Sequence, residues 1–130
     1  MLIETGHPII ISEQVNDTSN RLTPEDIPSN VTHITTHIED DQIHKSALIN
    51  IGTDASDTTH IWVNDIDCYL HFSKVLEILT DTNALDEFNF IQPFEVVKDL
   101  TEKETDDILN DRPVKVKFNG SDVFNKGSDE

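Results

Sequence analysis

Runs of apolar and β-branched residues in the first half of the chain predict strands. The first run covers residues 2–12, where Gly6 and Pro8 indicate a strand that is bent or lies at a sheet edge. The second run covers residues 31–38, almost all of which favour a strand. The polar stretch 14–30 lies between these runs and contains prolines, so we predict a long loop there.

A third β-favourable run, residues 46–51, follows a short acidic connection, so we expect it to form a hairpin with the second run. Residues 60–63 and 66–70 add further strand. The dipeptide Asn64-Asp65 between them is either a two-residue turn or an interruption of one long strand. The sequence leaves both interpretations open.

A helical period replaces these runs after residue 71. Apolar residues spaced i, i+3, i+4 and i+7 predict a helix with one apolar stripe, which should end at about Thr80. The residues of this stripe are Phe72, Val75, Leu76 and Leu79. A second helical or irregular segment is expected over residues 84–90, and Pro93 stops it.

Two capping signals predict shorter helices. Thr101-Glu-Lys-Glu is a capping box, in which Thr101 is the N-cap and Glu104 takes the third helical position. This helix should end near Asn110, because Pro113 follows. Thr23 precedes a proline and two carboxylates, which predicts one short helical turn inside the loop.

The end of the chain carries the most specific hairpin signal. Asn119-Gly120 suits a type I′ turn. Closing the turn there brings an apolar pair and an opposite-charge pair into register, namely Val116 with Val123 and Lys117 with Asp122. We therefore predict a C-terminal β-hairpin within residues 113–124, followed by a flexible tail over residues 125–130.

Composition favours a sheet over a helical bundle. Fifteen Ile and nine Val residues stand against only three Ala, and β-branched side chains suit pleated strands better than helices. A length of 130 residues fits one domain. The predicted fold is a single α+β domain over residues 1–124, with a mainly antiparallel sheet, two or three short helices and the C-terminal β-hairpin.

Charge narrows the classes of partner. The chain has 26 Asp and Glu residues against nine Lys and Arg, a net charge of −17. Direct binding to nucleic acid or to an anionic membrane is disfavoured, because such a surface repels polyanions. A basic protein is the kind of partner that a negatively charged surface would attract. The plain alternative is that the charge only keeps the protein soluble.

Carboxylates near the C-terminal third could form the binding face. If residues 95–111 are mostly helical, four carboxylates at i, i+4, i+7 and i+11 share one side, and they are Glu95, Asp99, Glu102 and Asp106. A row of carboxylates on a rigid backbone can stand in for phosphates in the basic groove of a nucleic-acid-binding protein. We expect the partner to bind Asp99, Glu102 and Asp106, and also a second patch, Glu39, Asp40 and Asp41.

Nothing in the sequence points to catalysis. Phosphate loops, nucleophile elbows and zinc-protease helices are missing, and we expect no enzyme activity, no cofactor and no bound metal. His33 and His37 would share one strand face, but i and i+4 on a strand lie about 13 Å apart, too far for one Zn²⁺. A metal-dependent enzyme that uses Asp65, Asp67 and His60 is the third hypothesis.

The leading prediction is a non-enzymatic acidic binding protein that inhibits or sequesters a basic partner by electrostatic complementarity. The alternative is a structural or assembly protein that forms homo-oligomers through its sheet edges. Trp62 is expected in the core, and would be an interface anchor if it were exposed. The single Cys68 cannot form an internal disulfide, and no apolar run reaches about 18 residues, so we expect a cytoplasmic protein.

Overall fold

The computed structural model describes residues 6–114, which form two compact units, one ending at Glu87 and one beginning at Phe88. The predicted tail and nearly all of the predicted hairpin over residues 113–124 lie outside the described residues. The single domain over residues 1–124 stays a prediction.

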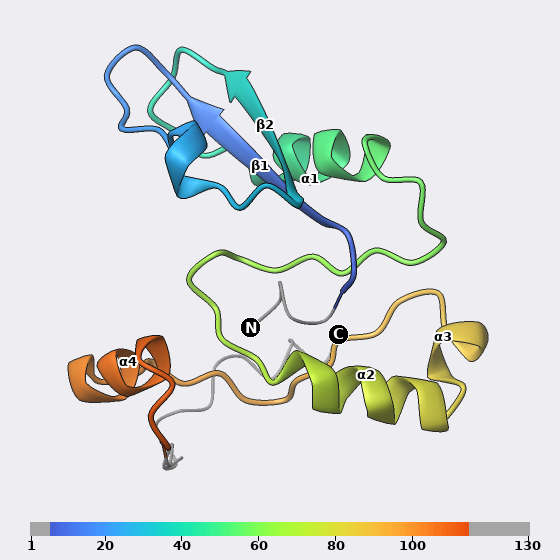
Figure 1. Cartoon of the computed structure of the whole chain (residues 1–130). Helices are drawn as coiled ribbons and strands as arrows, with labels where there is room; N and C mark the ends of the chain where they lie inside the picture. The colour runs from blue at the N-terminus through green and yellow to red at the C-terminus, as the bar shows by residue number, and fades with distance from the viewer. Residues whose placement is uncertain (1–5, 115–130) are drawn as a thin grey trace, which may run out of the picture. The chain divides into compact units, whose positions relative to one another are not determined.

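The sheet of the first unit has two parallel strands, β1 (Ile9–Val15) and β2 (Val31–His37), which point the same way in Figure 1. The register runs from Ile9 opposite Val31 to Val15 opposite His37. Parallel strands need a long crossover, which residues 16–30 provide here. The crossover contains a 3-10 helix, η2 (Pro24–Asp26), at the predicted helical turn.

The prediction of a mainly antiparallel sheet is wrong. Among residues 6–114 the structure contains two strands, and they pair in parallel. The strand predicted over residues 46–51 is instead part of α1 (Lys45–Asp54), so it cannot form a hairpin with β2. The β-favourable residues of this run are helical in the structure.

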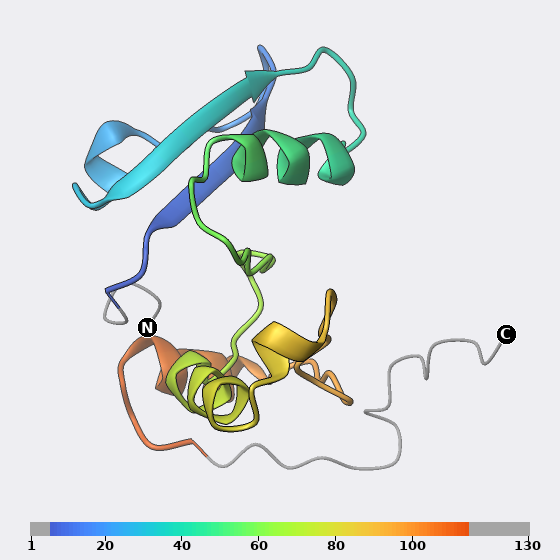
Figure 2. The same ribbon diagram turned by 90° about the vertical axis from the view of Figure 1, so that its right-hand side faces the viewer.

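Packing against β1 explains why this run is helical. Leu48, Ile51 and Gly52 are spaced i, i+3 and i+4, and all three are partly buried. Gly52 faces the sheet, where a Cβ atom on it would lie 3.6 Å from Ser12 Cβ, and Figure 2 shows α1 alongside the strands. Strand propensity depends on tertiary context, and the helical spacing prevails here.

A glutamine of β1 holds the start of this helix. The side-chain amide of Gln14 donates to the Gln42 carbonyl at 2.7 Å, and its oxygen accepts from the backbone N–H of His44 at 2.8 Å. His44 immediately precedes α1. The polar residue at this strand position therefore satisfies the N–H of the N-cap residue, which the helix itself leaves unpaired, and one carbonyl of the preceding connection.

The strands predicted over residues 60–63 and 66–70 are absent from the described structure, where this region is irregular. A turn centred on Ile66 and Asp67 is closed by the Cys68 N–H, which donates to the Asp65 carbonyl at 3.0 Å. The Asn64 side chain donates to the carbonyls of Asp65 and Cys68 at 2.7 and 3.1 Å. The turn therefore lies two residues beyond the position that the sequence suggested.

The prediction of a helix from Phe72 is confirmed by α2 (Phe72–Asp81), in which Leu79 of the predicted stripe is buried. A short helix, α3 (Ala84–Glu87), follows within the segment predicted as helical or irregular. Asn83 joins the two helices with φ +53°, a left-handed conformation that asparagine tolerates.

The second unit contains α4 (Glu102–Leu109), and its capping box is confirmed. The Glu104 N–H donates to Thr101 Oγ1 at 3.2 Å, while the Thr101 N–H donates to the Glu104 carboxylate at 2.8 Å. Two backbone donors at the helix start are thus satisfied by two side chains.

The described residues bury few apolar side chains. Val15 and Leu79, exposed by 4% and 9%, are the buried apolar residues among them, while eleven large apolar side chains are exposed. Apolar side chains exposed singly are common on folded surfaces, whereas a contiguous apolar patch is what marks a surface that contacts another molecule.

Candidate functional site

Three phenylalanines are exposed near the start of the second unit: Phe88, Phe90 and Phe94. Phe90 is 85% exposed, the highest value among the large apolar residues described. This stretch forms neither helix nor strand, and Pro93 lies within it. The three rings are therefore exposed side chains on an irregular segment of the chain.

The predicted row of four carboxylates on one helix face does not form. The helix begins only at Glu102, so Glu95 and Asp99 precede it and share no helical face with it. The row was predicted for a helix spanning 95–111, but the capping box at Thr101 starts the helix later. Glu102 and Asp106 keep the i, i+4 relation on α4.

Cations neutralise only part of this acidic region. Residues 88–114 contain three cationic side chains, Lys98, Lys103 and Arg112. Lys98 binds Glu104 at 3.2 Å, Lys103 binds Asp107 at 2.8 Å, and Arg112 binds both Asp106 and Asp107. Of the predicted binding residues, Asp106 is therefore paired, whereas Asp99 and Glu102 have no ion pair within residues 6–114.

Asp107 was not singled out from the sequence, yet it organises this helix. It is 9% exposed, and Lys103 and Arg112 hold its two carboxylate oxygens at 2.8 Å each. The hydrogen bond from Lys103, followed by that from Arg112, lowers the pKa of Asp107 below its usual value. Asp107 serves structure, and its ion pairs leave the exposed carboxylates Asp99 and Glu102 without local cations.

The second predicted patch, Glu39, Asp40 and Asp41, lies in the connection between β2 and α1. All three side chains are exposed. Asp40 accepts a hydrogen bond from His44 Nε2 at 2.6 Å, which lowers the pKa of Asp40 below its usual value. Within this patch, Asp40 is therefore held in its charged form by a neighbouring histidine.

The structure does not bring Asp65, Asp67 and His60 together as a metal site. Asp65 binds Lys45 Nζ at 2.7 Å, and this contact raises the pKa of that lysine. His60 Nε2 donates to the Leu85 carbonyl at 3.1 Å. Within residues 6–114, the one group of three metal-ligating side chains is a different set: Asp17, His37 and Glu39.

Cys68 is a poor candidate for a nucleophile. Partial desolvation, and then the negative charges of Asp67 and Asp65, raise the pKa of its thiol above the usual value. A protonated thiol is weakly nucleophilic at neutral pH.

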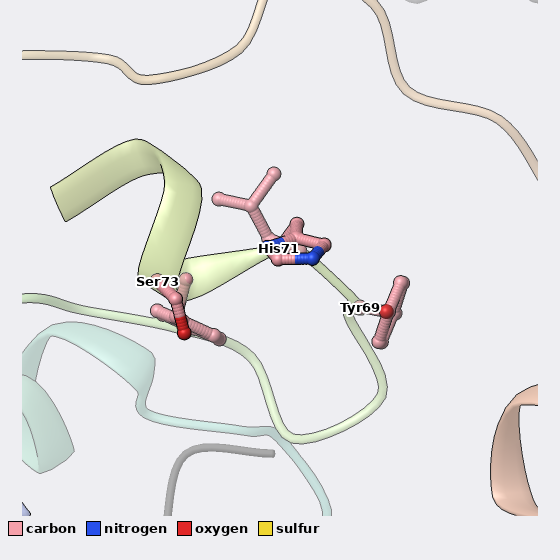
Figure 3. A pocket seen from close by; sticks show the side chains of 5 residues that line it. Tyr69, His71 and Ser73 are labelled. Carbon is pink, nitrogen blue, oxygen red and sulfur yellow. The ribbon is translucent and has the colours of Figure 1, made fainter. Parts of the chain in front are cut away.

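A shallow pocket lies at the start of α2, lined by Tyr69, Leu70, His71, Phe72 and Ser73. In Figure 3 the Ser73 hydroxyl points away from the His71 ring. A serine nucleophile needs its base within hydrogen-bonding reach, so this pair does not form the start of a catalytic triad.

Trp62 is only partly exposed, and its ring packs on Phe72 with a centroid separation of 4.7 Å. Trp62 therefore does not meet the condition set for an interface anchor, whereas Phe90 and Phe94 are exposed aromatic side chains. Their proximity to Pro93 and Glu95, in a segment without helical or strand periodicity, is the signal that could have identified them.

Comparison with protein-family models, curated proteins and solved structures finds no match to this chain. Among the described residues, none of the helices has the length and apolar character needed to cross a membrane.

Proposed function

We propose that this chain is a non-enzymatic acidic protein that inhibits or sequesters a basic, nucleic-acid-binding protein in the cytoplasm. The observation that carries the proposal is the composition of residues 88–114. Their cations are all bound by Glu104, Asp106 and Asp107, while exposed aromatic rings and unpaired carboxylates remain on the same unit.

Charge and apolar contact would have separate roles in this interaction. The net charge of −17 attracts a cationic partner over a distance and accelerates encounter. Binding energy at protein interfaces concentrates on a few aromatic anchors that become fully desolvated. Phe90 and Phe94 are suited to this role, with Asp99 and Glu102 as nearby carboxylates in the sequence.

The experiment compares two variants of equal charge. The first combines Asp99→Asn, Glu102→Gln and Asp106→Asn, and the control combines Asp81→Asn, Asp86→Asn and Glu87→Gln. A host pull-down with the full chain supplies the basic protein, and association rates are then measured with that purified protein over a salt series. We expect the first variant to associate about tenfold more slowly and the control to change much less.

A third variant tests the apolar anchors. Phe90→Ser with Phe94→Ser should mainly raise the dissociation rate, because short-range contacts act after encounter. Equal losses in both charge variants would show that only overall charge matters and would refute the assigned surface. Unchanged dissociation of the double phenylalanine variant would refute the anchor assignment.

A second candidate function is self-assembly through sheet edges. Within residues 6–114, β1 and β2 pair only with each other, so each has an outer edge that is not hydrogen-bonded to another described strand. Such edges can pair with another copy of the chain. A concentration-dependent oligomer that persists in high salt during sedimentation would support this function over the first.

A further inference from the structure

A mixed cluster of imidazole and carboxylate groups lies at the carboxyl ends of the two parallel strands. His37 is the last residue of β2, and Glu39 follows it by two positions. Asp17 follows Val15, the last residue of β1, by the same interval. Because Val15 lies opposite His37 and the strands run in parallel, the carboxyl ends of both strands lie at the same end of the sheet (Figure 1).

The geometry of this cluster centres on one ring nitrogen. His37 Nε2 lies 3.2 Å from Asp17 Oδ1 and 3.1 Å from Glu39 Oε1. The three ligand atoms all lie within 4.8 Å of one another. One imidazole N–H points along a single direction and can make one well-aligned hydrogen bond, yet two carboxylate oxygens approach this nitrogen.

A metal ion would use all three groups at once. Two ligands each about 2.0–2.2 Å from an ion, at bond angles of about 90–110°, lie about 2.8–3.6 Å apart. The separations of His37 Nε2 from Asp17 Oδ1 and from Glu39 Oε1, 3.2 and 3.1 Å, fall within this range, and the two carboxylate oxygens lie within 4.8 Å of each other. We propose that Asp17, His37 and Glu39 form a binding site for a divalent transition-metal ion, for which Zn²⁺ best fits the donor set.

The choice of ion follows from the ligand chemistry. Zn²⁺ binds imidazole nitrogen together with carboxylate oxygen, and three protein ligands leave its fourth position for water. Ca²⁺ and Mg²⁺ prefer sites made of oxygen ligands, so the imidazole favours a transition metal over both. This assignment shares Glu39 with the second predicted patch but uses none of the residues to which the proposed binding function is assigned.

Backbone contacts hold the cluster in place. The Ile38 N–H donates to the Val15 carbonyl at 2.9 Å, which continues the strand pairing past His37. The Asn16 side-chain oxygen accepts from the Thr18 and Ser19 N–H groups at 3.0 and 2.7 Å and so fixes the turn that carries Asp17. Little ordering is therefore left for the ion to impose on the backbone.

The chain offers a matched control pair nearby. His44 Nε2 lies 2.6 Å from Asp40 Oδ2. Both side chains are well exposed, as is that of His37. This pair has one imidazole and one carboxylate but lacks the second carboxylate. It should therefore bind Zn²⁺ much more weakly than the cluster of three.

The test is calorimetric titration of the full, chelator-treated chain with Zn²⁺ in millimolar Ca²⁺, which occupies acidic groups without selectivity. We expect one saturable Zn²⁺ per chain. Asp17→Asn, Glu39→Gln and His37→Gln should each weaken binding by at least about tenfold, because even partners outside the ligand shell have effects of that size. His44→Gln should leave the affinity within about twofold, since it removes no ligand.

Several outcomes would overturn the assignment. These are the absence of saturable Zn²⁺ binding, complete competition by Ca²⁺, or a loss of Zn²⁺ affinity in His44→Gln as large as that in the ligand variants. Retained binding in the Asp17 and Glu39 variants would also overturn it. These two exposed positions lie outside the strands, so their variants decide the question even if His37→Gln disturbs β2, which far-UV circular dichroism would show.

Discussion

Glu13 and His33 join the two parallel strands through a hydrogen bond of 2.7 Å between Oε2 and Nε2. Both side chains are largely buried, with 16% and 19% of their surface exposed. The other oxygen of Glu13 accepts from the Leu22 N–H at 3.0 Å. One carboxylate therefore fixes both the neighbouring strand and the crossover that connects the strands.

Glu13→Ala should destabilise the first unit. The substitution leaves the Leu22 N–H and the His33 ring without their acceptor, and such a loss costs about 1–3 kcal/mol in the free energy of unfolding. Urea denaturation followed by circular dichroism measures the change. Asp41→Ala, at an exposed position, is the control and should change stability by less than about 0.5 kcal/mol. Equal effects of both variants would contradict the assigned role.

Thr101→Ala should destabilise α4 by about 1 kcal/mol, because it removes the N-cap that accepts the Glu104 N–H. Thr105→Ala makes the same chemical change four residues later. Thr105 only donates to the Thr101 carbonyl, so its loss should be near neutral in an alanine-favouring helix interior. Helicity measured against urea concentration separates the two, and a larger effect at Thr105 would contradict the capping assignment.

Acid should weaken the second unit through Asp107. Lys103 and Arg112 lower its pKa in the folded state, so the stability contribution is complete above the ordinary carboxyl pKa of 3.8. It is lost as the pH falls through the lowered folded-state value, which places the loss below about pH 4. The dependence of the unfolding midpoint on pH measures this effect.

Asp107→Asn supplies the check on that pH dependence. The variant should be less stable than the parent at pH 7, and the difference should narrow on acidification as the parent loses its ion pairs. Glu102→Gln, which breaks no ion pair within the described residues, should follow the parent. A constant difference between Asp107→Asn and the parent from neutral to acid pH would exclude this carboxylate as the titrating group.

Local signals in the sequence correctly predicted two of the helices, α2 and α4. The capping box at Thr101 and the apolar spacing from Phe72 to Leu79 act within one or two helical turns, so neighbouring residues determine them. The parallel direction of β2 and the helical state of residues 45–54 depend instead on contacts with β1. Those contacts are distant in sequence, and β-branched composition alone favoured the wrong topology.

The same distinction applies to the candidate site. The net charge can be counted from the sequence, but the ion pairs cannot. Arg112 lies beyond the end of α4, and its side chain pairs with Asp106 and Asp107 on that helix. These ion pairs determine which carboxylates stay unpaired. Likewise, Asp17 and His37 are 20 residues apart, and only the parallel pairing places them together.

The contact between Trp62 and Phe72 gives a spectroscopic test of the first unit. The chain has one tryptophan, and its ring lies 4.7 Å from that of Phe72 at an interplanar angle of 56°. Phe72 begins α2, so the pair attaches the irregular segment before the helix to the helix itself.

Phe72→Leu retains an apolar side chain but removes the aromatic pairing, which contributes about 0.5–1.5 kcal/mol. Tryptophan emission should move to longer wavelength as water reaches the indole, and the free energy of unfolding should fall by that amount. Phe90→Leu changes a ring in the second unit and should leave emission unchanged, so an equal shift in both variants would show that the emission does not report this contact.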